Sequence, residues 1–118
     1  DLISLRNYAC SGNNKFFLGT DSAPHHFNDK VPNLSSKPGI FSSPCSIEVY
    51  ASIFDEENQI KNLEKFSSIN GPNFYNLKVN NEHIKLIKKV WKVPEFTMYN
   101  DIKIKNFMAG KKLQWKVI

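Results

Sequence analysis

The spacing of apolar residues predicts a helix followed by a strand at the start of the chain. Apolar positions recur at helical spacing over residues 2–10, and Gly12 stands where a glycine commonly terminates a helix. Residues 15–20 form an apolar run without alternation, which is typical of a strand covered on both faces in a parallel sheet. A helix followed by a buried strand is part of an α/β repeat.

A long loop and a second helix are predicted next. Residues 21–43 are rich in Pro, Ser, Asn and His and show no periodicity. A loop that leaves the C-terminal end of a strand is where α/β folds place their active sites. Ser43 and Pro44 are typical of an N-cap and a first helical position, and apolar residues follow at helical spacing. We therefore expect a helix over about 44–57.

Further along, the pattern changes from helical to strand-like. A short helix is expected from residue 60, and Asn70-Gly71-Pro72 is expected to break it. Three later segments are β-rich or alternate between apolar and polar residues, as short strands do: 84–93, 102–105 and 113–117. We divide the chain into an α/β part, 1–76, and a C-terminal extension with short strands, 77–118.

The single predicted α/β strand poses a topological problem. A parallel strand needs neighbours in its sheet, and the α/β part of this chain supplies none. From this mismatch we expect further chain before residue 1.

The net charge of +5 raises the possibility of nucleic-acid binding. Fifteen of the sixteen basic residues are Lys and only Arg6 is Arg, whereas base-edge recognition relies heavily on the bidentate Arg side chain. The lysines also alternate with apolar residues, as on the solvated faces of helices and strands. We therefore expect no nucleic-acid partner.

Other bulk features favour a cytoplasmic domain. No apolar run approaches the ~20 residues that span a bilayer, and the first residues lack the pattern of a secretory signal. We expect no membrane association. Cys10 and Cys45 have neither CxxC spacing nor further partners, so we interpret both as packing residues.

The sharpest chemical feature lies at residues 19–26, directly after the predicted strand. Asp21 at the tip of a strand, with His25 and His26 close behind, has the residue types that ligate a metal, shuttle a proton or hold an anionic substrate. The structural alternative is that Asp21 caps the loop and both histidines lie on the surface. Residue types alone leave both interpretations open.

The segment Gly19-Thr20-Asp21-Ser22-Ala23-Pro24-His25 resembles the strand-eight signature of dihydroorotases, members of the binuclear-zinc amidohydrolase superfamily with a (β/α)8 TIM barrel. The serine after the aspartate, Ser22, resembles the residue at this position in the bacterial-type, monofunctional branch of the family. Further blocks that resemble the family follow in its order over essentially the whole chain: Gly39 to Pro44, Tyr50 to Asn58, Asn70 to Tyr75, Phe107 to Gly110, and Trp115.

The resemblance implies a reaction and roles for three residues. The reaction is the reversible, zinc-dependent cyclisation of N-carbamoyl-L-aspartate to (S)-dihydroorotate in pyrimidine biosynthesis. Asp21 is then the catalytic general acid and base and a ligand of one of two zinc ions. His25 binds the substrate carboxylate. Pro38 aligns with a substrate-contacting residue, commonly Ala, and it retains only a carbonyl for that contact because proline has no N–H.

The resemblance also shows what the chain lacks. The family's His-x-His pair, bridging carboxylated lysine and further zinc-binding histidines are missing, and His26 and His83 match no ligand, so both are expected at the surface. A barrel takes about 250 residues. The chain is therefore expected to supply the last helix-strand-helix unit, to need the remainder of the barrel as its partner, to be inactive alone, and to form a homodimer.

Two alternatives remain. A hydantoinase or dihydropyrimidinase shares the chemistry but fits less well, because His25 and the Asn70-Gly71-Pro72 block resemble dihydroorotases specifically. The other alternative is a free-standing, lysine-rich binding module with a decayed active site. It predicts cooperative folding and salt-sensitive partner binding without zinc.

Overall fold

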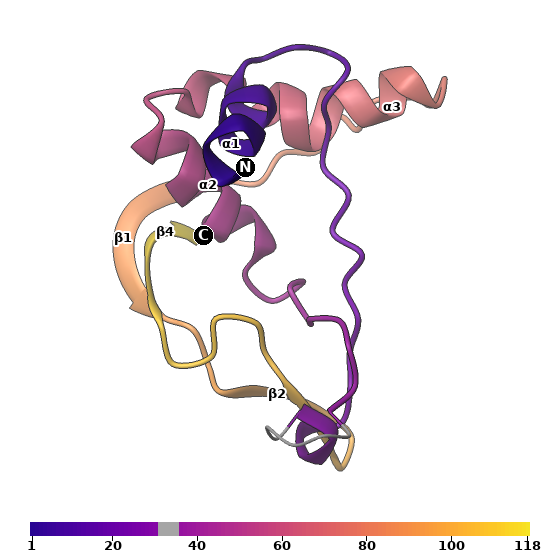
Figure 1. Cartoon of the computed structure of the whole chain (residues 1–118), viewed down its shortest axis with the longest axis vertical. Helices are drawn as coiled ribbons and strands as arrows, with labels where there is room; N and C mark the ends of the chain where they lie inside the picture. Colours follow the sequence, from indigo (N-terminus) through magenta and orange to yellow (C-terminus); the bar gives the residue numbers. More distant parts are fainter. Residues whose placement is uncertain (31–35) are drawn as a thin grey trace.

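The computed structural model describes residues 1–30 and 36–118. Helices gather at one end of the molecule, and the chain after α1 runs along one side to the opposite end, where η1 lies beside β2 (Figure 1). The elements in chain order are α1 (Leu2–Cys10), η1 (Phe27–Lys30), α2 (Ser46–Glu56), η2 (Ile60–Asn62), η3 (Lys65–Ile69), α3 (Asn70–Phe74), β1 (Leu86–Lys92), β2 (Phe96–Tyr99), β3 (Ile102–Lys105) and β4 (Lys112–Val117).

The first helix is confirmed at its predicted bounds. The Asp1 carboxylate accepts a hydrogen bond from the Ile3 amide at 3.0 Å, which satisfies one of the unpaired N–H groups of the first turn. Gly12 follows the helix with φ +76°, the left-handed conformation of a terminating glycine. The Asn62 side chain completes this end by donating to the Cys10 carbonyl at 2.8 Å.

The predicted strand over about 15–20 is not formed within the described residues. Residues 16–20 have no regular structure and belong to no sheet; Leu18 donates its amide to the Phe66 carbonyl at 3.0 Å. The apolar run does contribute to packing, because Phe16 and Leu18 lie against the main core. A parallel strand forms only through hydrogen bonds to neighbouring strands, and no strand of the described residues lies beside this segment.

The helical stretch after residue 60 differs from expectation, because it continues through Asn70-Gly71-Pro72. The π-helical η3 leads directly into α3, and the Asn70 amide donates to the Lys65 carbonyl five residues back. Asn70 is buried, and its Nδ2 donates to the carbonyls of Phe16 at 3.0 Å and Asn13 at 3.3 Å. These tertiary bonds hold the helix across the proline and override the local break signal.

The C-terminal extension contains the expected strands and one more. β1 pairs antiparallel with β4, and β2 forms a hairpin with β3, which gives two two-stranded sheets. β2 was not predicted from the sequence. The extension is packed onto the α/β part: β4 lies against α2, and Leu86 and Trp115 contact the main core cluster. The helices and the β1–β4 sheet therefore share the main core.

The core confirms the interpretation of both cysteines. Cys10 packs with Ala51, Phe54 and further residues of the helices, whereas Cys45 packs with residues of the extension, and both cysteines are free. Burial raises the pKa of both thiols, so they are held in the unreactive protonated form.

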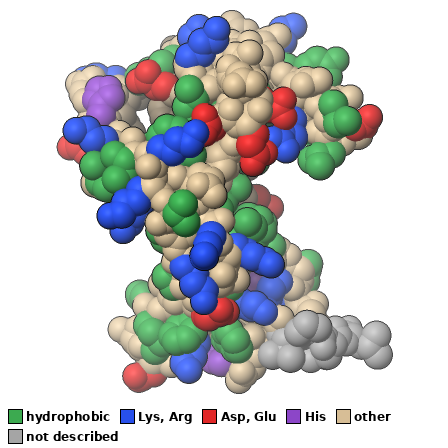
Figure 2. Space-filling model, turned by 90° about the vertical axis from the view of Figure 1, so that its left-hand side faces the viewer, with side chains coloured by type: hydrophobic (Ala, Val, Ile, Leu, Met, Phe, Trp, Pro, Cys, Tyr) green, Lys and Arg blue, Asp and Glu red, His purple; other side chains and the backbone are tan. Residues whose placement is uncertain are grey.

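The lysines lie mostly on the surface, as predicted. Figure 2 shows Lys and Arg side chains over the middle of one face, mixed with hydrophobic side chains. Among the described residues, no helix is both long and apolar enough to span a membrane.

Candidate functional site

Asp21 lies where the extended segment ends and the long loop begins. Its backbone has φ +44°, in the left-handed region that residues other than glycine rarely adopt, and its side chain is exposed. Aspartate tolerates this conformation better than most residues, yet such strain concentrates at functional sites. The geometry presents the carboxylate to the outside of the described structure, where a ligand can reach it.

The two residues after Asp21 attach it to the segment that precedes α2. The Ser22 hydroxyl oxygen accepts hydrogen bonds from the amides of Ser42 and Ser43, both at 3.1 Å. The Ala23 amide donates to the Ile40 carbonyl at 2.8 Å. Three bonds therefore fix the position of Asp21 relative to the far end of the loop.

α2 begins two residues later than predicted, and Ser22 contacts the segment just before it. The N-cap is Cys45, which makes no side-chain capping bond, and residues 43–45 form a turn. The Ser22 hydroxyl takes up the amides of Ser42 and Ser43 from across the loop. The sequence identified Ser22 only as a mark of the bacterial-type branch, so this structural role was missed.

His25 lies beside the part of the loop that carries Pro38. Gly39 has φ +91°, and a Cβ atom placed on it would lie 3.6 Å from Nε2 of His25 and 2.7 Å from Cβ of Ala23. His25 is half-buried, whereas Pro38 is exposed. Gly39, the residue directly after Pro38, therefore lies close to the His25 side chain. A glycine in the loop was the only sequence signal of this close approach.

The other two histidines lie at the surface, as expected. The His26 side chain is exposed, its Nδ1 accepts from the Asn28 amide at 3.2 Å, and its backbone forms an isolated bridge with Ile104 of β3. His83 is exposed, with Nε2 4.0 Å from a Glu64 carboxylate oxygen. Neither lies with Asp21 in a ligand cluster.

The described residues do not by themselves form a zinc site. Within residues 1–30 and 36–118, no three His, Cys, Asp or Glu side chains come close enough together to hold a metal ion. Zinc sites in enzymes take three or more protein ligands. Within the described residues, Asp21 has no further potential zinc ligands clustered around it.

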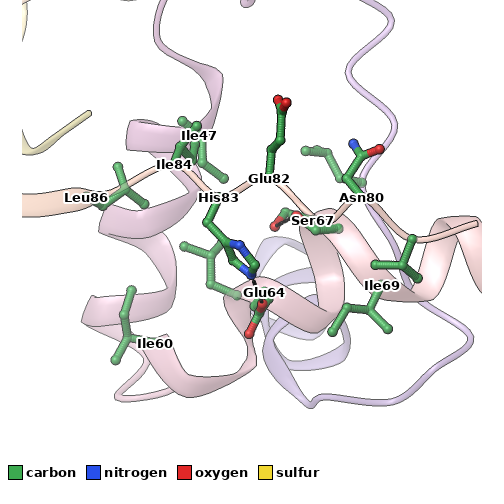
Figure 3. Close-up of a pocket in the computed structure, with 14 residues that line it drawn as sticks. Ile47, Ile60, Glu64, Ser67, Ile69, Asn80, Glu82, His83, Ile84 and Leu86 are labelled. Carbon is green, nitrogen blue, oxygen red and sulfur yellow. Dashed lines mark hydrogen bonds and ion pairs between the residues drawn. The ribbon is translucent and has the colours of Figure 1, made fainter. Parts of the chain in front are cut away.

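A separate cleft of about 550 Å³ lies between the η2–η3 helical stretch and the segment that enters β1 (Figure 3). Its wall is largely aliphatic, and His83 points toward Glu64 within it. Asp21, His25 and Pro38 do not line this cleft. The predicted chemistry therefore lies in the loop and not in this cavity.

Comparisons with known proteins agree with the loop's resemblance. No family model matches the chain. The dihydroorotase of Buchnera aphidicola is 44% identical over 115 residues, and that of Aliivibrio fischeri is 44% identical over 114 residues. These alignments cover 98% and 97% of the chain but 33% of each relative, so the chain spans about a third of their length.

The structural comparison points the same way. The structure of Saccharomyces cerevisiae dihydroorotase in complex with 5-fluoroorotic acid superposes with a TM-score of 0.85 at 36% identity. The superposition covers 98% of this chain and 33% of the yeast chain. Over nearly its whole length, this chain is a homologue of the C-terminal portion of dihydroorotases.

Proposed function

We propose that this chain forms the C-terminal part of a dihydroorotase, which interconverts N-carbamoyl-L-aspartate and (S)-dihydroorotate in pyrimidine biosynthesis. The observation that carries the proposal is the similarity to dihydroorotases along 98% of the chain, in sequence at 44% identity and in fold with a TM-score of 0.85. In this proposal residues 1–76 complete a (β/α)8 barrel, and residues 77–118 are its C-terminal extension.

The barrel also accounts for the irregular segment 16–20. Its apolar side chains pack on the helices, while its backbone lies outside any sheet of the described residues. Neighbouring barrel strands would supply the missing ladder and convert this segment into the eighth strand.

Asp21 is proposed as the general base that takes a proton from the attacking water and returns it to the departing amide nitrogen. A single carboxylate suits both steps, because it is regenerated when the proton passes on. His25 and Pro38 are proposed to bind the substrate, with His25 at the carboxylate. The proximity of Gly39 to His25 supports a shared binding surface for these two residues.

The proposal includes two zinc ions per active site, with Asp21 as one ligand and the remaining ligands from the rest of the barrel. Bound zinc lowers the pKa of water and polarises a carbonyl, which is the chemistry that amide hydrolysis requires. We further propose a homodimeric, cytoplasmic enzyme.

The test is the hydrolysis of dihydroorotate by the native protein that contains this chain, before and after Asp21→Asn. The exchange removes the proton acceptor with little change in size, so we expect kcat to fall at least about a hundredfold. Zinc content is measured on the same samples.

The matched control is Asp101→Asn, an exposed aspartate in the turn between β2 and β3. It is expected to leave kcat unchanged. Turnover of hydantoin in place of dihydroorotate, or activity that survives Asp21→Asn, would contradict the proposal.

A further inference from the structure

Lys30 makes two hydrogen bonds at the substrate loop that the proposed chemistry does not explain. It is the last residue of η1, and its Nζ donates to the carbonyl of Lys37 at 2.5 Å and to that of Gly39 at 2.6 Å. These carbonyls belong to the residues on either side of Pro38. Bonds from an ammonium group are stronger than those between neutral groups.

The neighbouring residue reinforces this attachment. The Asp29 carbonyl accepts from the Lys37 amide at 3.1 Å, and the Asp29 carboxylate pairs with the Lys37 ammonium at 2.9 Å. The hydrogen bond from Lys37 lowers the pKa of the Asp29 carboxyl, so the pair stays charged. The end of η1 and the residues around Pro38 are therefore joined by four contacts.

The attached segment in turn contacts the proposed binding residues. Gly39 lies close to Ala23 and to Nε2 of His25, and the Ile40 carbonyl accepts from the Ala23 amide. A shift of residues 37–39 away from Lys30 would move Pro38 relative to His25. Pro38 has no N–H, so the direction of its carbonyl is its only means of polar contact with a substrate.

We propose that Lys30 is a positioning residue for substrate binding: its ammonium holds the two carbonyls that flank Pro38 and thereby sets the Pro38 carbonyl against the His25 side of the site. The inference rests on the proposed function. Lys30 acts on the loop and not on the reacting atoms, so its removal affects substrate affinity more than the chemical step.

The experiment measures kcat and KM for dihydroorotate in the native protein with Lys30→Met, which keeps the length of the side chain and removes the donor. We expect KM to rise about tenfold, the loss that corresponds to one charge-assisted bond, with kcat within about twofold. Lys30→Arg can donate to both carbonyls and is expected to recover most of the affinity. Lys89→Met, at an exposed lysine of β1, is the matched control and is expected to leave KM unchanged.

Two results would overturn the inference. One is an unchanged KM in folded Lys30→Met. The other is a fall in kcat as large as the rise in KM, without rescue by Lys30→Arg, which would indicate a general structural role. If Lys30→Met does not fold, Lys30→Gln is judged by the same criteria, because its shorter amide cannot reach both carbonyls. Absence of turnover in the unaltered protein would contradict the proposed function instead, so the two failures are distinguishable.

Discussion

At the scale of single residues, Gly39 is where the loop tolerates a side chain least. Its φ of +91° is unfavourable for any residue with a Cβ, and that Cβ would lie 2.7 Å from Cβ of Ala23. We predict that Gly39→Ala in the native protein lowers the free energy of unfolding by roughly 1–3 kcal/mol. It should also raise KM for dihydroorotate, because relief of the contact displaces the loop from His25. Urea denaturation and steady-state kinetics measure the two effects.

The steric and conformational parts of this effect can be separated. The double variant Gly39→Ala/Ala23→Gly removes the atom that the new methyl group meets but leaves the strained φ. It is expected to reverse part of the rise in KM and a smaller part of the loss in stability. An unaltered KM in Gly39→Ala would disprove the close approach of the loop to His25.

At the scale of elements, one carboxylate joins α2 to both strands of the β1–β4 sheet. Asp55 Oδ2 accepts from Trp115 Nε1 of β4 at 3.2 Å and pairs with Lys88 Nζ of β1 at 2.6 Å. Lys88 and Trp115 are partners in the strand register. The hydrogen bond from Lys88, followed by that from Trp115, holds the pKa of Asp55 below its ordinary value.

This lowered pKa predicts a pH dependence of stability. The folded state prefers charged Asp55 more strongly than the unfolded state does, so the contribution is complete above the ordinary carboxyl pKa. It is lost as the pH falls from about 5 through the lowered folded-state pKa. Asp55→Asn in the native protein should therefore have a lower melting temperature at pH 7, and its difference from the unaltered protein should shrink toward pH 3.

The difference in melting temperature between Lys88→Met and the unaltered protein should also shrink toward pH 3, because this variant removes the other half of the ion pair. Asp101→Asn should follow the unaltered protein at every pH. A constant difference between Asp55→Asn and the unaltered protein over this range would show that the pair does not couple protonation to folding.

The elements that could be predicted from the sequence are those that local signals determine. The first helix was predictable because its spacing and Gly12 are local signals, and the helix over about 44–57 was found within two residues. The strand at 15–20 and the break at 70–72 are not seen in the described structure because both depend on distant partners. The described residues supply no sheet neighbours for the first, and the bonds from Asn70 to Asn13 and Phe16 hold the second in the helix. For the candidate site, Asp21, His25 and Pro38 came from motif resemblance, whereas Lys30 and Ser22 emerged only from contacts across the loop.

At the scale of the whole molecule, the chain exposes more surface than a compact domain of its size. Its accessible surface is 8588 Å², whereas a monomeric protein of this mass exposes about 6,600 Å². The radius of gyration is 15.6 Å, against about 13.5 Å for a compact domain of this length. Exposed apolar side chains contribute to this excess, including several on α1 and just after α3: Leu2, Ile3, Leu5, Tyr8, Tyr75 and Leu77.

These surfaces lead to a prediction for the isolated 118-residue chain. If they pack against the rest of the proposed enzyme, the isolated chain should bind the dye ANS strongly and self-associate, whereas the native protein should do neither. The double variant Ile3→Glu/Leu5→Lys should reduce both effects. A monomeric isolated chain with no dye binding would instead favour the free-standing module.

The two tryptophans of the chain occupy neighbouring positions at the junction between the sheet and α2. Trp91 Nε1 donates to the Trp115 carbonyl at 2.6 Å, and Trp115 donates to Asp55. Indole emission shifts with the polarity around the ring, so this pair is a native optical reporter of one junction. A red shift that precedes the loss of helical circular dichroism would reveal the extension detaching as a separate unfolding step.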